Sequence, residues 1–114
     1  MAPWEGGKQQ GFDYCYYERL YDRLQSSDVH PIREHLRAGL DYQDKLARFL
    51  ENHGEPRAAS AFQWQKHRAA AAITFLSPGL RFFHQGPFEG ARVRVPVHLC
   101  RGPAEPTDQD TAAF

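Results

Sequence analysis

The sequence predicts a small α/β protein in which short parallel strands alternate with helices. The 114 residues are enough for one domain. Some segments carry apolar residues at helical spacing, and others are short apolar or aromatic runs bounded by Gly or Pro. The resulting order is strand, helix, helix, strand, loop, helix, strand, which is typical of βα units built around a parallel sheet.

The N-terminal half is expected to contain one strand and two helices. Residues 11–16 are aromatic and follow a turn-like glycine, so we expect an extended segment. Over 17–26 the apolar side chains recur at helical spacing, which predicts an amphipathic helix. Asp28 and Pro31 are typical of a helix start and Gly39 of a stop, which predicts a second helix.

The middle of the chain contains one ambiguous segment and two clear ones. Residues 40–50 are ambiguous: their apolar residues continue a helical period, but residues 46–50 fit a short buried strand equally well. Residues 65–76 contain a block of four alanines, which favours a helix, and the Ser-Pro-Gly at 77–79 ends it. Residues 80–84 form a compact aromatic run and are predicted to be a strand.

The C-terminal part is expected to be loop, strand and tail. Arginine and valine alternate over 92–99, which predicts a half-exposed strand, and Pro96 marks it as an edge strand or an extended tail. The predicted organisation has three parts: a disordered segment over 1–10, a folded region over 11–103 and a polar tail over 104–114.

The apolar content predicts a thin core. Leu, Ile, Val and Phe together make up about a fifth of the chain. Alanine supplies 14 of the 47 hydrophobic residues and buries little area. A parallel sheet of only three strands would also leave an open edge and an uncovered face.

Composition and charge exclude several classes of protein. No apolar run is long enough to span a membrane, and the first ten residues lack the pattern of a secretory signal. The net charge is zero, so the chain lacks the electrostatic footprint of a dedicated nucleic-acid-binding protein. Cys15 and Cys100 allow one disulfide, but two thiols in a reducing compartment are favoured, which predicts a cytoplasmic protein.

Two polar clusters follow predicted strands and are the candidate functional residues. The first is ENHGEPR over 51–57, and the second is HQG over 84–86 with Glu89 nearby. Functional residues of βα folds lie at the carboxyl ends of the strands, so both clusters are expected to line one cleft. The alternative is that polar residues simply follow buried strands because loops are solvated.

Three segments resemble the α-amylase clan of glycoside hydrolases. FLENHGEPR over 49–57 is similar to the seventh barrel strand and the Asn-His-Asp that ends it. TFLSPGLRFFHQG over 74–86 resembles the following helix end, turn and eighth strand. GFDYCYYERLYDRL over 11–24 resembles the region of the sixth strand in bacterial members. The resemblance covers about residues 9–103 and implies a partial, truncated (β/α)₈ (TIM) barrel with strands six to eight.

The resemblance implies a site that binds an α-glucan or a maltooligosaccharide in the parent enzyme, with no cofactor and no oligomeric state implied. His53 matches the histidine that hydrogen-bonds sugar hydroxyls at the cleavage point, and Asn52 helps to hold the turn. Gln85 and Glu89 on the next loop would add sugar contacts. The parent would carry out retaining hydrolysis or transfer of α-glucosidic bonds in carbohydrate metabolism.

Two departures from the family pattern predict that this chain does not catalyse that reaction. Gly54 stands where the family has the Asp that supports the transition state, and the loss of one such group costs about 3–4 kcal/mol. The nucleophile and the acid/base of the family lie on the fourth and fifth strands, upstream of the matched segments. Glu5 has no preceding strand and is not assigned the acid/base role.

Two other functions remain open at the sequence level. A zinc site built from His53, His84 and a carboxylate is geometrically feasible but strongly disfavoured against histidines that face solvent or sugar. A small, non-catalytic interaction protein that docks a partner through the open sheet edge is the main alternative, supported by 15 aromatic residues.

Overall fold

The computed structural model describes residues 10–95 and 102–114. The chain divides into two compact units. The first comprises residues up to Phe49 together with Ala72–Phe82, and the second comprises Leu50–Ala71 and Phe83–Phe114. In the described part of the chain, no helix is both long and apolar enough to cross a membrane. The predictions for residues 1–9, Pro96 and Cys100 lie outside the described residues.

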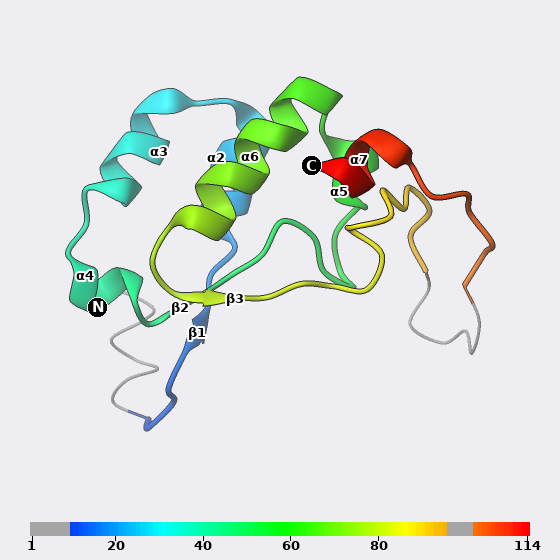
Figure 1. The fold of residues 1–114 in the computed structure, drawn as a ribbon. Helices are drawn as coiled ribbons and strands as arrows, with labels where there is room; N and C mark the ends of the chain where they lie inside the picture. The colour runs from blue at the N-terminus through cyan, green and yellow to red at the C-terminus, as the bar shows by residue number, and fades with distance from the viewer. Residues whose placement is uncertain (1–9, 96–101) are drawn as a thin grey trace. The chain divides into compact units, whose positions relative to one another are not determined.

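The first unit contains a three-stranded parallel sheet, which confirms the predicted α/β class (Figure 1). Strand β1 (Cys15–Tyr16) pairs with β2 (Leu46–Arg48), and β2 pairs with β3 (Leu80–Arg81). The strands therefore follow one another in space in the order of the sequence. The ambiguity over 40–50 is resolved in two parts: helix α4 (Leu40–Gln43) is followed by β2, whose three residues are buried.

Two predicted helices of this unit are present. Helix α2 (Arg19–Ser26) buries one face, made of Leu20, Tyr21 and Leu24. Helix α3 (Val29–Leu36) starts where the sequence indicates, because the Asp28 carboxylate accepts a hydrogen bond from the His30 N–H. The two helices pack against each other.

Helix α6 (Trp64–Leu76) and the turn that follows lead the chain into β3. Gly79 has φ +118°, and a Cβ added there would lie 2.5 Å from the Leu46 carbonyl oxygen. Only glycine fits this close approach to β2. Strand β3 is shorter than the predicted 80–84, although the Phe82 N–H still donates to the Arg48 carbonyl.

A buried polar cluster, the Arg48 cluster, occupies the interior of the first unit. The Arg48 guanidinium donates to the Pro78 carbonyl, to His35 Nε2 at 3.0 Å and to Gln43 Oε1 at 3.0 Å. Gln43 in turn donates to the carbonyls of Leu36 and Ala38. A guanidinium has no acceptor, so His35 accepts through Nε2 and is neutral.

The second unit contains two short helices that the sequence analysis missed. Helix α5 (Ala58–Ala61) lies in what was read as a loop, and α7 (Gln109–Ala113) lies within the predicted polar tail over 104–114. Asp108 caps α7 by accepting the Thr111 N–H at 2.8 Å. That hydrogen bond holds the pKa of Asp108 below its usual value.

The prediction of a strand over 92–99 is wrong for the described residues 92–95. Their backbone groups bond to side chains and form no strand ladder. The Glu105 carboxylate accepts from the N–H groups of Arg92 and Val93, and Ser60 Oγ donates to the Arg92 carbonyl. Tertiary contacts have therefore replaced the pairing that the alternating pattern favours.

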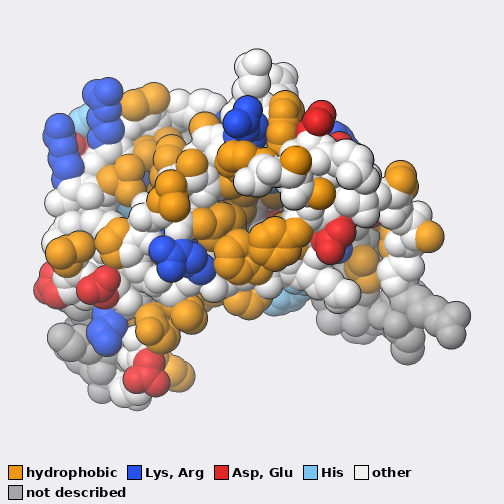
Figure 2. Space-filling view, viewed as in Figure 1, with side chains coloured by type: hydrophobic (Ala, Val, Ile, Leu, Met, Phe, Trp, Pro, Cys, Tyr) orange, Lys and Arg blue, Asp and Glu red, His pale blue; other side chains and the backbone are white. Residues whose placement is uncertain are grey.

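The first unit leaves much of its apolar surface exposed. Hydrophobic side chains are conspicuous on the surface in view (Figure 2). The exposed fraction is 63% for Phe12, 66% for Leu40 and 47% for Tyr16 on β1. The two residues of the edge strand β3 are exposed as well. These exposed side chains agree with the open edge and uncovered face expected of a parallel sheet with only three strands.

The neutral, buried His35 predicts a pH-dependent stability. Burial, with the charges of Arg48 and Arg23, lowers the pKa of His35 from 6.5 to about 4. Between these two values the unfolded chain binds more protons than the folded one, so stability falls as pH decreases from 6.5 to 4. The loss should approach about 3 kcal/mol, measured by urea unfolding across this range.

The variant His35→Gln should reduce the slope of this part of the pH profile, with the buried His67, whose pKa burial also lowers, supplying the remainder. His30→Gln should leave the slope unchanged because His30 is exposed. An unaltered slope in His35→Gln would show that His35 titrates normally in the folded protein.

Candidate functional site

The candidate site lies in the second unit, where the chain continues beyond β2. Asn52 is buried, and its Oδ1 accepts hydrogen bonds from the N–H groups of Gly54 at 2.7 Å and Glu55 at 2.8 Å. The side chain thereby closes a tight turn, as Asn commonly does. His53 and Gly54 are exposed on this turn. The predicted turn-holding role of Asn52 has a direct structural basis.

A buried ion pair supports the turn on both sides. Glu51 and Arg57 flank it, and Arg57 Nη1 lies 2.9 Å from Glu51 Oε1. Only 2% of the Glu51 side chain and 8% of the Arg57 side chain are exposed. The second carboxylate oxygen of Glu51 accepts the N–H of Ala58, at the start of α5, at 2.7 Å. The ends of the turn are therefore fixed by charge-assisted hydrogen bonds.

Arg57 also holds the second predicted cluster. Its Nη1 donates to the Gln85 carbonyl at 2.6 Å, and its Nε donates to the Val93 carbonyl at 3.1 Å. Gly86 adjoins this contact with φ +108°, and a Cβ there would lie 3.1 Å from Arg57 Nη1. One guanidinium thus connects the segments that follow β2 and β3.

The predicted site residues fall into three structural settings. Asn52 is buried and closes the turn, while His53 and Gly54 lie on it in contact with solvent. Gln85 has an exposed side chain and is anchored through its carbonyl. Glu89 is also exposed, and its carbonyl accepts the N–H of Asp108 at 2.9 Å. The structure brings Gln85 to Arg57 and hence to the turn, and it links Glu89 to α7.

Sequence reasoning assigned no role to Glu51 and Arg57, which organise the site. Both belong to the ENHGEPR cluster over 51–57, so the cluster was found but not its internal pairing. The signal that could have found it is the spacing of opposite charges around a turn. That signal is weak, because most such pairs are solvated surface charges.

The buried carboxylate of the site is already engaged in hydrogen bonds. Glu51 is engaged by Arg57 and Ala58, and position 54 has no side chain. Across residues 10–95 and 102–114, no three His, Cys, Asp or Glu side chains gather to hold a metal ion. His53 and His84 thus belong to no such group in the described residues.

Comparisons of the chain with protein-family models, with curated proteins and with solved structures find no match.

Because this ion pair is buried, two similar substitutions should differ strongly in their effect on the free energy of unfolding. Glu51→Gln leaves the Arg57 charge buried without its counterion and should reduce the free energy of unfolding by about 3 kcal/mol. Glu34→Gln removes the carboxylate of the exposed Glu34–Arg37 pair and should cost less than about 0.5 kcal/mol. Denaturant unfolding of both variants measures the difference, and equal effects would argue against a buried pair.

Proposed function

We propose that this chain is a cytoplasmic, catalytically inactive segment of an α-amylase-like glycoside hydrolase barrel. It would comprise strands six to eight and retain a contact surface for α-glucans. The assignment to the cytoplasm rests on two cysteines without a CxxC motif. The contact surface would be formed by His53 on its turn, together with Asn52, Gln85 and Glu89.

The observation that carries this proposal is the link between the two segments that follow consecutive parallel strands. In βα barrels, the loops after the strands form the binding face. Here Arg57 bonds both to Glu51, beyond β2, and to the carbonyl of Gln85, beyond β3. Two further features agree: the strands neighbour each other in sequence order, and the sheet has uncovered apolar surface.

The proposed lack of hydrolysis is supported by the same residues. A retaining glycosidase needs two carboxyl groups about 5 Å apart, one as nucleophile and one as acid/base. In the resembling family these lie on strands that precede the matched segments, and Gly54 replaces the third carboxylate. The Glu51 carboxylate cannot substitute, because two donors occupy its oxygens. What remains is a donor and acceptor at His53 that can bond sugar hydroxyls.

The exposed sheet edge favours a second function, a non-catalytic protein that docks a partner. The two residues of β3 are exposed at the edge of the described sheet, and Tyr16 of β1 is 47% exposed. An open edge is a template for pairing with another chain. Size-exclusion chromatography distinguishes the two functions: a stable oligomer without sugar affinity would favour docking.

Sugar binding without turnover is the first test. The purified chain mixed with maltoheptaose should release no reducing ends, while amide signals of the turn shift in NMR titration. His53→Ala should weaken binding by about threefold to tenfold, because one or two hydrogen bonds are lost. His30→Ala, an exposed histidine on α3, is the control and should have no effect. Turnover, or full binding by His53→Ala, would contradict the proposal.

Restoring the missing carboxylate is the second test. A Cβ at Gly54 would lie 3.3 Å from Asn52 Oδ1, so a side chain fits after a small shift. Gly54→Asp should therefore remain folded and bind maltoheptaose about tenfold more tightly, because a charged acceptor is gained. Gly54→Ala adds only the methyl group and should bind like the wild type. Equal affinities in the two variants would refute a sugar at this position.

A further inference from the structure

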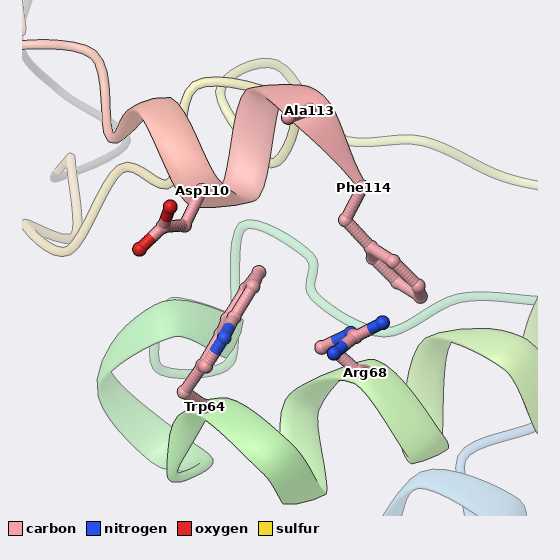
Figure 3. Close-up of a pocket in the computed structure, with 5 residues that line it drawn as sticks. All are labelled: Trp64, Arg68, Asp110, Ala113 and Phe114. Atoms are coloured by element: carbon pink, nitrogen blue, oxygen red, sulfur yellow. The ribbon is translucent and has the colours of Figure 1, made fainter.

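Helix α7 and the start of α6 meet through an aromatic contact in the second unit (Figure 3). The ring of Phe114, the residue after α7, lies edge to face with the Trp64 ring of α6, with centroids 6.2 Å apart. The guanidinium carbon of Arg68 lies 4.9 Å from the Phe114 centroid and 5.8 Å from the Trp64 centroid. Figure 3 shows Arg68 and Phe114 on one side of the indole and Asp110 on the other. We call the surface made of Trp64 and Arg68 the α6 face; Phe114 covers it in this structure.

The segments that meet here carry opposite charges. From residue 56 to residue 88 the chain contains four Lys or Arg residues and no Asp or Glu, and two of the four, Lys66 and Arg68, lie on α6. Residues 102–114 contain three acidic residues and no Lys or Arg. Opposite charges steer two surfaces together and disfavour partners of the wrong sign. The α6 face therefore favours an acidic segment, and α7 belongs to one.

Helix α7 is held at its start by hydrogen bonds and at its end by a single ring. At the start, the Asp108 N–H donates to the Glu89 carbonyl at 2.9 Å, and the Asp108 carboxylate caps the helix. At the end, the Phe114 ring that contacts α6 is itself 58% exposed. None of the five residues of Gln109–Ala113 is buried. An isolated helix of this length is unstable in water, so α7 depends on these few contacts.

The packing between α7 and α6 is also open. A pocket of about 430 Å³ that is open to solvent lies between the two helices. Its lining residues are Trp64, Arg68, Asp110, Ala113 and Phe114. Segments with few buried apolar contacts open locally at a much lower free energy than the whole protein. Helix α7 should therefore detach from α6 while the rest of the second unit stays folded.

The α6 face itself rests on buried residues. His67 is 8% exposed, and its ring meets the Trp64 ring edge to face, with centroids 6.2 Å apart. The His67 ring also stacks on the buried ring of Phe62, with centroids 6.3 Å apart. Trp64 and Arg68 are four residues apart on one helix and so project from the same side. The α6 face should therefore keep its shape when α7 detaches.

The contacts of α7 indicate which ligand the α6 face accepts. An aromatic ring lies against a guanidinium because the negative face of the ring attracts the cation. Asp110 and Phe114 are four residues apart, which is the spacing of neighbours along one side of a helix. A matching segment thus has an acidic residue and, four positions later, a phenylalanine. A basic segment would be repelled by Lys66 and Arg68, and a segment without an aromatic ring would leave Trp64 uncovered.

We propose that the α6 face is a docking site for an acidic, phenylalanine-bearing peptide segment of another protein, and that α7 with Phe114 is a detachable strap that occupies it. Within one chain the strap acts at an effective concentration of about 1 mM, so a partner must bind more tightly than the strap does. The strap thereby restricts docking to partners that make additional contacts. The site shares no residue with the turn that carries His53 or with β3, and it is independent of both functions proposed above.

Quenching of tryptophan fluorescence measures the opening of the strap. The chain has two tryptophans, so a Trp4→Phe background leaves Trp64 as the sole fluorophore. Phe114→Ala in this background should raise the acrylamide quenching constant of Trp64 about twofold, because opening no longer costs a ring contact. Phe88→Ala is the matched control. Phe88 is 61% exposed and packs against Phe83, so its loss should leave the quenching of Trp64 unchanged.

A peptide added in trans tests the docking site. A synthetic peptide with the sequence of residues 105–114 should bind the Phe114→Ala chain with a dissociation constant of about 1 mM, because few groups make contact. It should not bind detectably to the Trp4→Phe chain, whose own strap occupies the site. The same peptide with alanine in place of its phenylalanine should not bind either chain. Adding Arg68→Gln to the Phe114→Ala chain should weaken binding about threefold through loss of the cation–π contact. Arg33→Gln, at an exposed arginine of α3, should have no effect.

Four results would overturn the proposal. The first is equal quenching of Trp64 with and without Phe114, and the second is equal binding, or none, of the peptide by the two chains. The third is equal binding of a peptide in which lysines replace the three acidic residues. The fourth is a Trp64 quenching constant of the Trp4→Phe chain that falls as protein concentration rises, which would place the strap on a second copy of the chain. A well-dispersed amide spectrum of each variant shows that it is folded.

Discussion

The buried ion pair between Glu51 and Arg57 is the interaction on which the candidate site depends. Removing both charges from water costs several kcal/mol per ion, and this cost is offset only when further hydrogen bonds satisfy each group. Here they do: Glu51 also accepts the Ala58 N–H, and Arg57 donates to the carbonyls of Gln85 and Val93. Those extra bonds connect the turn after β2 to the loop after β3.

Within residues 10–95 and 102–114, buried arginines replace apolar packing at two places. Each guanidinium donates to three acceptors. Arg48 in the first unit bonds to one carbonyl and two side chains. Arg57 in the second unit bonds to two carbonyls and one side chain. A guanidinium offers five donors in a fixed plane, so one side chain can tie several loops together. In a chain whose apolar residues are few, such polar cross-links position loops that a larger core would hold by packing.

The parts of the fold that the sequence predicts correctly are those governed by local signals. The helix over 17–26 follows from the spacing of its apolar residues, α3 from its Asp28 cap, and α6 from its alanine block. The parallel order of the strands follows from the helices between them. These signals act within a few residues, so the sequence displays them directly.

The missed features depend on contacts between residues far apart in the chain. The Ala58 N–H at the start of helix α5 donates to the Glu51 carboxylate, and the N-cap of α7 packs closely against Gly90. The predicted strand over 92–99 fails at 92–95 because Glu105 and Ser60 take its backbone groups. The candidate site follows the same rule: the motif over 51–57 locates the turn, but the bond from Arg57 to Gln85 spans 28 positions and has no local signature.

The central claim is that one ion pair holds both segments of the site together. NMR chemical-shift mapping of Glu51→Gln, at a temperature where the variant stays folded, tests it most directly. The account predicts that backbone amide signals shift both within 51–58 and around Gln85 and Gly86, because Arg57 bonds to both segments. Shifts confined to residues 50–58, with the signals of 85 and 86 unchanged, would contradict it.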